Sequence, residues 1–160
     1  MESVGGQEMT VAVAQEIKLR ILGEVAPQGS KTMTRYGAMR ESCKKLMPWR
    51  HSIQYACDQQ YHGPLLTGPV EIDVTFLFVR PKGHWSTAKG KEDQLLPSAP
   101  RHHSTTPDVD KCLRALLDGL SAKCGGNVLR DDSLVVRLRC SKRYASAEES
   151  PGVLVSLRTI

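Results

Sequence analysis

Four short apolar segments, each long enough for a strand and too short to span a bilayer, most constrain how this chain can fold. The first, "AQEIKLRILGEV" at residues 14–25, alternates apolar and charged side chains, which predicts a half-buried strand. Its inward-facing residues are Ile17, Leu19 and Ile21. Further strands are predicted over residues 70–80, 134–144 and 153–157. Because the longest apolar stretches are strand-sized, we expect no membrane-spanning helix.

Two helices are predicted between these strands. The first begins at about Pro48, since proline is tolerated at a first helical position. Residues that recur at helical spacing along it are Trp49, Ile53, Ala56, Cys57 and Gln60. The second runs from about Lys111 to Ala122, with a core stripe of Leu113, Leu116, Leu117 and Leu120. The order β-α-β-(long loop)-α-β-β predicts an α+β domain with a small mixed β-sheet and two main helices.

The length of 160 residues suits one domain, expected over residues 9–160 after a disordered tail at residues 1–8. Residues 26–37 are expected to form a loop, with glycines and a proline as turn signals. A longer stretch at about 82–106 has no apolar periodicity, and we expect a flexible loop there. Loops of this length are usually functional or disordered.

The five cysteines contain no C-x-x-C pair and are interpreted as small hydrophobic residues, several of them buried. The N-terminus has acidic residues and no basic region, so it does not resemble a secretory signal. These features are typical of a protein in the reducing cytoplasm.

The net charge of +5 predicts an anionic partner, because the basic residues are clustered. Residues 29–51 hold six Lys or Arg against one acid, and residues 137–143 hold four with no acid. The alternative is a cationic surface that is merely solvated.

Two pairs of aspartates stand before predicted elements: Asp108 and Asp110 before the second helix, and Asp131 and Asp132 before the third strand. Side chains at i and i+2 of an extended segment point to the same side, and Pro107 favours an extended residue before it. Crowded carboxylates repel, so they need a cation between them. Oxygen-only ligands favour Mg²⁺, which can activate water and neutralise a phosphoryl transition state. The alternative for Asp110 is an N-cap role.

Two cations, Lys111 and Arg114, occur early in the second helix. Positive charge is unfavourable near a helix N-terminus, so a compensating anion is expected. The nearby carboxylates and a DNA phosphate are candidates. The alternative is that Arg114 forms a surface ion pair with Asp118, four residues later.

The segment "PDVDKCLRALLDGLSAKCGGNVLRDDSLVV", with "SKRY" downstream, resembles the RusA family of Holliday junction resolvases. The family motif is P-D-x-D-N-L-x-K-x-x-x-D-x-L, then D-D-x-x-V, then K. The resemblance is strong over residues 107–144 and weaker over "PQGSKTMTRYG" and "PWRHSIQYA". This chain departs from the motif at Lys111, where the family has asparagine, and at Arg114, where it has lysine.

The resemblance implies a small homodimeric endonuclease, bacterial or phage-encoded, that cuts four-way DNA junctions by paired phosphodiester hydrolysis. It implies Mg²⁺ as cofactor, with Mn²⁺ able to substitute, and no organic cofactor or membrane partner. Asp108, Asp110 and Asp132 are then the catalytic metal ligands, with Asp131 beside them. Arg114 stands at the position of the family's catalytic-helix lysine.

The expected DNA-binding residues are basic side chains from both clusters and from the motif: Lys31, Arg35, Arg50, Lys111, Lys142 and Arg143. Lys142 follows Asp132 by ten residues, which span about 33 Å in a straight strand. We therefore expect Lys142 to contact a phosphate or lie near a dimer partner, and not to serve the site of its own Asp132.

Three alternatives remain open. The chain could be a branched-DNA-binding module that has lost catalysis, or a nuclease acting on flaps or forks. A zinc site could combine His102 and His103 with Cys112 or Cys124, although this spacing matches none of the usual structural zinc patterns.

Overall fold

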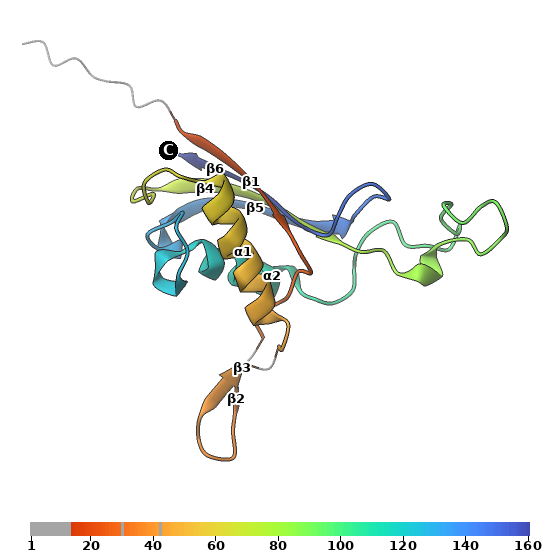
Figure 1. Ribbon diagram of the computed structural model, residues 1–160, viewed down its shortest axis with the longest axis horizontal. Coiled ribbons are helices and arrows are strands. Elements are labelled where there is room, and N and C mark those ends of the chain that lie inside the picture. The colour runs from red at the N-terminus through yellow and green to blue at the C-terminus, as the bar shows by residue number, and fades with distance from the viewer. Residues whose placement is uncertain (1–13, 30, 42) are drawn as a thin grey trace, which may run out of the picture.

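A four-stranded mixed sheet with two helices on one face forms the body of the molecule (Figure 1). The computed structural model describes residues 14–29, 31–41 and 43–160, so the tail expected at residues 1–8 lies outside the described residues. The strand order is β1-β6-β4-β5, with β5 parallel to β4 and the other neighbours antiparallel. The predicted α+β class is confirmed. The body consists of β1 (Glu16–Leu22), α1 (Leu46–Gln60), β4 (Val70–Phe78), α2 (Val109–Leu120), β5 (Val135–Tyr144) and β6 (Gly152–Thr159).

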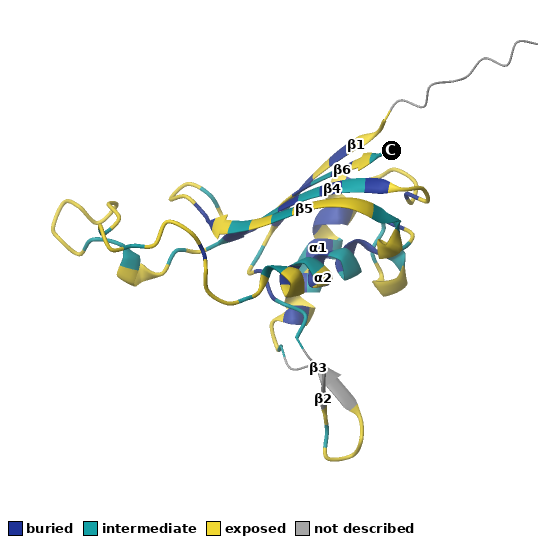
Figure 2. Cartoon of the chain, turned by 180° about the vertical axis from the view of Figure 1, so that it is seen from behind, coloured by how far each residue is buried: buried dark blue, intermediate teal, exposed yellow. Residues whose placement is uncertain are grey.

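The core lies between the sheet and the two helices, where Figure 2 shows the buried positions concentrated. In β1 the alternating residues are buried as predicted, and β4 buries every second residue from Val70 to Phe76 against the helices. The charged residues between them face the other side of the sheet, where Glu71 contacts Arg137 and Arg158. Period-2 patterning therefore places one face of the sheet inside and leaves the other in solvent.

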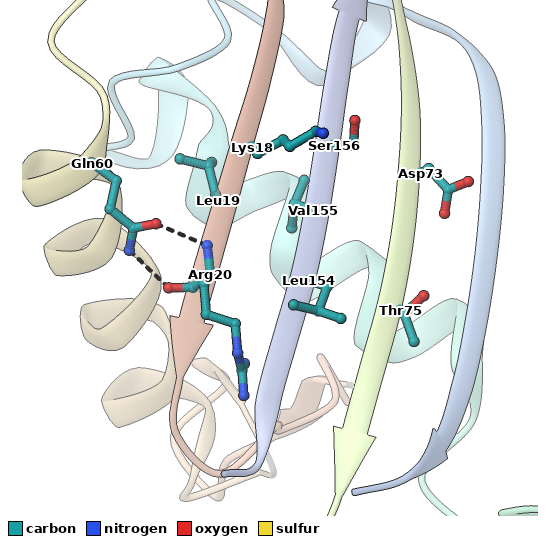
Figure 3. Close-up of a pocket in the computed structure, with 9 residues that line it drawn as sticks. All are labelled: Lys18, Leu19, Arg20, Gln60, Asp73, Thr75, Leu154, Val155 and Ser156. Carbon is teal, nitrogen blue, oxygen red and sulfur yellow. Dashed lines mark hydrogen bonds between the residues drawn. The ribbon is translucent and has the colours of Figure 1, made fainter. Parts of the chain in front are cut away.

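Helix α1 begins at Leu46, two residues before the predicted start, and buries Trp49 and Ile53 as expected. Gln60 has a different role from the apolar one that its spacing indicated. Its side chain accepts a hydrogen bond from the Arg20 N–H (2.8 Å) and donates one to the Arg20 carbonyl (2.7 Å), as Figure 3 shows. At this edge of the sheet no further strand pairs with β1, and Gln60 supplies the hydrogen-bond partners for the backbone N–H and carbonyl of Arg20.

Helix α2 spans Val109–Leu120, about two residues earlier than predicted at each end. Leu116 and Leu120 are fully buried, whereas Leu113 and Leu117 are only partly covered. The helix crosses α1 closely at Gly119, where an added Cβ would lie 2.8 Å from Cγ2 of Ile53. The leucine stripe therefore fixes which side of α2 is buried and leaves the opposite side open.

The residues expected to form the first loop include strand β2 (Lys31–Met33), which pairs with β3 (Met39–Glu41) just beyond them to form a hairpin, and this corrects the sequence interpretation. It projects away from the body (Figure 1). Gly37 adopts a φ of 76° in its turn, a left-handed conformation that glycine tolerates best. The turn is closed by the Thr34 N–H, which donates to the Ala38 carbonyl at 2.7 Å.

The long segment after β4 forms an extended arm with a 3₁₀ turn at Lys82–His84 (Figure 1). Its two limbs pair locally, since the Leu96 N–H donates to the His84 carbonyl at 2.9 Å. At its base the ring of His103 stacks on Phe78, with centroids 4.3 Å apart, and lies 4.9 Å from the ring of Tyr144. His103 is 8% exposed, and burial lowers its pKa. Its surroundings are therefore aromatic, and among the described residues no group of three or more His, Cys, Asp or Glu side chains is close enough to hold the zinc ion considered as an alternative.

Four of the cysteines, Cys57, Cys112, Cys124 and Cys140, are free thiols. Cys57 and Cys112 are buried, Cys43 and Cys140 are partly buried, and Cys124 is exposed. Among the described residues, no helix has the length and apolar character needed to cross a membrane.

Candidate functional site

The first acidic pair lies at the start of α2, where the structure moves the N-cap to Asp108. Asp110 lies in the first turn, so its interpretation as the N-cap is wrong. The Asp108 side chain makes no capping hydrogen bond and instead contacts the Lys111 ammonium at 2.9 Å. That lysine lowers the pKa of Asp108, and the carboxylate in turn raises the pKa of Lys111. Asp110 is exposed and, among the described residues, makes no hydrogen bond or ion pair.

Lys142 lies next to this pair, near the end of β5. Its ammonium donates to the carbonyl oxygens of Thr105 (2.6 Å) and Pro107 (2.8 Å). Its positive charge also contributes, after Lys111, to the lowered pKa of Asp108. Lys142 therefore holds the segment that leads into Asp108, and it stands at the opposite end of β5 from Asp132.

The second acidic pair precedes β5 at a short 3₁₀ turn, Asp132–Leu134. Asp131 caps this turn by accepting a hydrogen bond from the Ser133 N–H at 3.0 Å, and its other oxygen contacts the Lys123 ammonium. Lys123 is the main cause of the strongly lowered pKa of Asp131. The pKa of Asp132 is raised, first by its hydrogen bond with Asp131, then by burial and by the charges of Asp131 and Asp118. Crowding of carboxylates, expected from the sequence, is thus present here.

Asp118 does not pair with Arg114, so the alternative of a local surface ion pair is wrong. Asp118 Oδ2 instead accepts a hydrogen bond from Arg50 Nη2 of α1 at 3.0 Å, with both side chains 21% exposed. The same Arg50 nitrogen donates to Gln28 Oε1 at 2.9 Å, and the Gln28 N–H donates to the Lys111 carbonyl at 3.0 Å. Arg50 therefore links α1 to α2 and to the segment that follows β1. Arg114, by contrast, is exposed and makes no ion pair in the described part of the chain.

Within one chain the two acidic pairs lie towards opposite ends of α2. Asp110 and Asp118 are separated by eight helical residues, about 12 Å of rise. Asp118, near the end of the helix, is close enough for its charge to raise the pKa of Asp132. No group of three or more His, Cys, Asp or Glu side chains close enough to hold a metal ion occurs among the described residues. The donor chemistry, carboxylate oxygen, fits a hard cation such as Mg²⁺. A single chain, however, supplies these donors as two separate pairs.

The remaining residues expected to bind DNA differ in how far they are free to do so. Arg143 makes two hydrogen bonds to Glu149, at 2.7 and 2.8 Å, and lowers the pKa of Glu149 to about 2. Arg35 lies exposed at the hairpin turn, with its guanidinium 5.5 Å from the ring centroid of Tyr36. The side chain of Lys31 lies outside the described residues.

Sequence reasoning did not identify Lys123 or Gln28, although both contact predicted site residues. Gln28 lies beside a cavity of about 580 Å³ between residues 24–29 and 106–111, which is lined in part by Asp108 and Lys111. The weak family resemblance over "PQGSK" was the available signal for Gln28. Lys123 had none, because its contact with Asp131 spans a turn whose shape the spacing does not reveal.

The architecture is that of an α+β domain in which two pairs of aspartates lie around α2. The family model described as endodeoxyribonuclease RusA matches residues 23–158, and the chain belongs to this family. The chain is also similar to the uncharacterized protein YqaN of Bacillus subtilis (strain 168). The two are 30% identical over 151 residues, which cover 90% of this chain and 96% of YqaN.

Proposed function

We propose that this protein is a divalent-metal-dependent endonuclease that resolves four-way DNA junctions by paired phosphodiester hydrolysis. The observation that supports this most directly is the exposed face of α2. Asp110 and Arg114, one turn apart, present a carboxylate and a guanidinium there, and neither makes an ion pair with a described residue. In a chain of the RusA endodeoxyribonuclease family, such a face suits a phosphate and its metal ion.

Asp108, Asp110 and Asp132 would hold Mg²⁺, with Asp131 beside them and Mn²⁺ able to substitute. The raised pKa of Asp132 supports this assignment, because it reflects negative charge that a cation would stabilise. When bound, the ion lowers the pKa of a water molecule and neutralises charge on the scissile phosphate. No organic cofactor is needed for this chemistry.

Arg114 would stabilise negative charge that develops on the phosphate. Its guanidinium stays protonated at any physiological pH, so it acts by charge and hydrogen bonding and does not donate a proton to the leaving oxygen. Lys142 would act as a positioning residue, since its ammonium holds the Thr105 and Pro107 carbonyls that precede Asp108. Arg35, exposed on the projecting hairpin, would contact DNA outside the reaction centre.

A branched-DNA-binding module without catalysis is the second candidate. The ion pairs of Asp108 with Lys111 and of Asp131 with Lys123 favour it, because each places an ammonium on an expected metal ligand. The lysine of each pair is largely exposed, at 48% for Lys111 and 67% for Lys123, and can return to water when a divalent cation takes its place. The nuclease therefore remains the better-supported function.

The deciding experiment incubates the purified protein with a labelled four-way junction, a linear duplex and a flap, each in Mg²⁺ and in EDTA. We expect symmetric paired cuts in the junction that require Mg²⁺. Asp110→Asn should abolish these cuts while junction binding persists or tightens, since a negative charge facing phosphate has been removed. If the unaltered protein binds the junction without cutting it, the binding module is favoured. If it cuts the flap in preference to the junction, the flap is the substrate.

A further inference from the structure

The arm between β4 and α2, residues 79–103, has no part in the proposed reaction. It extends beyond the end of the sheet at which β4 and β5 finish, and most of its residues are exposed (Figures 1 and 2). Its two limbs are hydrogen-bonded to each other, since the Ser86 N–H donates to the Gln94 carbonyl at 2.8 Å and the Leu96 N–H to the His84 carbonyl at 2.9 Å. Residues 87–93, called here the distal loop, therefore close a paired stem.

The root of the arm lies beside the first acidic pair. Arg80 Nη1 donates to the Pro100 carbonyl at 2.8 Å, which ties the outgoing limb to the returning limb. The Arg80 guanidinium also lies 4.1 Å from the ring centroid of Tyr144, the last residue of β5. The returning limb then leads into Asp108 through the segment whose carbonyls Lys142 holds. The arm thus begins next to the candidate metal ligands and leads away from them.

The arm carries positive charge that the chain itself does not neutralise. Residues 80–103 include five Lys or Arg and two acids. On the face of the sheet away from the helices, cations are ion-paired, for example Lys18 with Glu16 at 3.6 Å and Arg158 with Glu71 at 2.8 Å. Four cations of the arm are instead exposed and make no ion pair with a described residue: Lys82, Lys89, Lys91 and Arg101. Unpaired cations on an exposed extension favour an anionic partner.

The two acids of the distal loop, Glu92 and Asp93, make no ion pair with a described Lys or Arg. The backbone N–H groups of Glu92 itself and of Gly90 lower the pKa of the Glu92 carboxyl. Gly90 has a φ of 79°, a conformation that turns successive N–H groups towards one side. The backbone of the loop therefore attracts negative charge in addition to the lysines.

We propose that the arm lies along one duplex branch of the DNA, with Lys89 and Lys91 of the distal loop on its phosphates. DNA suits the arm better than a protein partner does, because lysine is depleted in protein interfaces and DNA interfaces are strongly positive. Nine residues separate Arg80 from Lys89 and reach at most about 30 Å, which is about nine base pairs at roughly 3.4 Å each. This inference rests on the proposed function, because it takes branched DNA to be the substrate held at the acidic residues.

The first test measures binding of a four-way junction in EDTA as a function of salt. Each phosphate contact contributes about 0.9 to the slope of log affinity against log salt. Lys89→Gln combined with Lys91→Gln should therefore lower the slope by about 2 and weaken binding at about 0.1 M salt at least tenfold. The matched control, Lys18→Gln combined with Arg158→Gln, removes the same charge from the sheet face and should leave the slope unchanged. An equal loss in both double variants would overturn the inference, because net charge alone would then explain it.

The second test locates the contact along the DNA. It compares a junction with branches of about 20 base pairs with one whose branches are shortened to about four and closed by loops. On the long branches wild type should bind at least about tenfold tighter than the Lys89 and Lys91 double variant. On the short branches the two should bind alike, since the distal loop then meets no phosphate. A difference of the same size on both junctions would contradict the proposed position of the loop.

Two further measurements separate this inference from the proposed function. Single-turnover cleavage at saturating protein should be equal for wild type and the arm variant, because the distal loop does not touch the reacting phosphate. An arm variant that binds like a cleaving wild type would refute the role of the arm and leave the nuclease intact. Weakened binding by the arm variant of a protein that cuts no DNA would support the arm and favour the binding module. Weakened self-association in sedimentation with unchanged DNA binding would assign the arm to a second copy of this chain and overturn the inference.

Discussion

The ion pair between Arg50 and Asp118 gives a prediction that separates a structural role from a catalytic one. Asp118 matches the helix aspartate of the RusA motif, and Asp118→Asn removes its charge with almost no change in shape. In the structure this residue contacts Arg50 and holds α2 against α1. We therefore expect the variant to lose stability while the chemical step of cleavage stays within a few-fold of wild type.

The expected magnitude follows from the burial of the pair. Fully exposed pairs contribute about 0.2–1 kcal/mol, and breaking a fully buried pair costs about 3–5 kcal/mol. Both side chains are 21% exposed, and Arg50 keeps its hydrogen bond to Gln28 in the variant. An intermediate loss of about 2 kcal/mol is therefore expected, close to the value of one hydrogen bond between charged groups. For a domain of this size it corresponds to a fall in Tm of about 4–8 °C.

Thermal unfolding followed by circular dichroism measures the loss, and single-turnover cleavage at a temperature where the variant is folded measures chemistry. Lys45→Met is the matched control, because it breaks the exposed pair with Glu24 and should leave Tm unchanged within about 1 °C. An Asp118→Asn variant with wild-type Tm and no cleavage would refute the reasoning, since Asp118 would then belong to the reaction centre.

Three further predictions concern other side chains. Arg114→Ala should lower the single-turnover rate by about a hundredfold or more, as for loss of one preorganised donor, while Arg114→Lys keeps substantial activity; an unchanged rate for the alanine variant would exclude a catalytic role. Because the pKa of Glu149 is lowered from 4.5 to about 2, its stabilisation is complete above pH 4.5 and is lost towards pH 2. The Tm difference between wild type and Glu149→Gln should therefore vanish over that range, and a difference that persists at pH 2 would contradict it. At pH 8 a thiol reagent should label exposed Cys124 in the native protein. Buried Cys57 and Cys112, whose pKa values are raised to about 12, should react only in denaturant, and their rapid labelling in the native state would be the contrary result.

Local patterning was enough to predict the body of the fold. The alternation in β1 and the leucine stripe of α2 each specify one buried face, and both faces are buried in the structure. The predicted start of α2 lies two residues after the observed one, because Asp108 and Asp110 are equally good capping residues by type. Which of them precedes the first helical residue depends on how the preceding segment, held by Lys142, enters the helix.

Partners distant in the sequence could not be predicted in this way. Helical spacing offered Arg114 as a partner for Asp118, but Arg50, 68 residues away, lies closer once α1 packs on α2. The hairpin of β2 and β3 was missed for a related reason, since three-residue strands are too short to show a period. Gln60 matched the helical period, but in the structure it bonds the exposed backbone of Arg20.

The placement of lysines beside the aspartates explains how a chain of net charge +5 can keep two carboxylate pairs in its candidate site. Each pair has one member in contact with a lysine: Asp108 with Lys111, and Asp131 with Lys123. Two carboxylates and one ammonium leave a single negative charge at each end of α2. Arg114, which makes no ion pair with a described residue, remains available to attract a phosphate. The same lysines limit repulsion between the carboxylates of each pair, so the chain can fold with its acids in place and without metal.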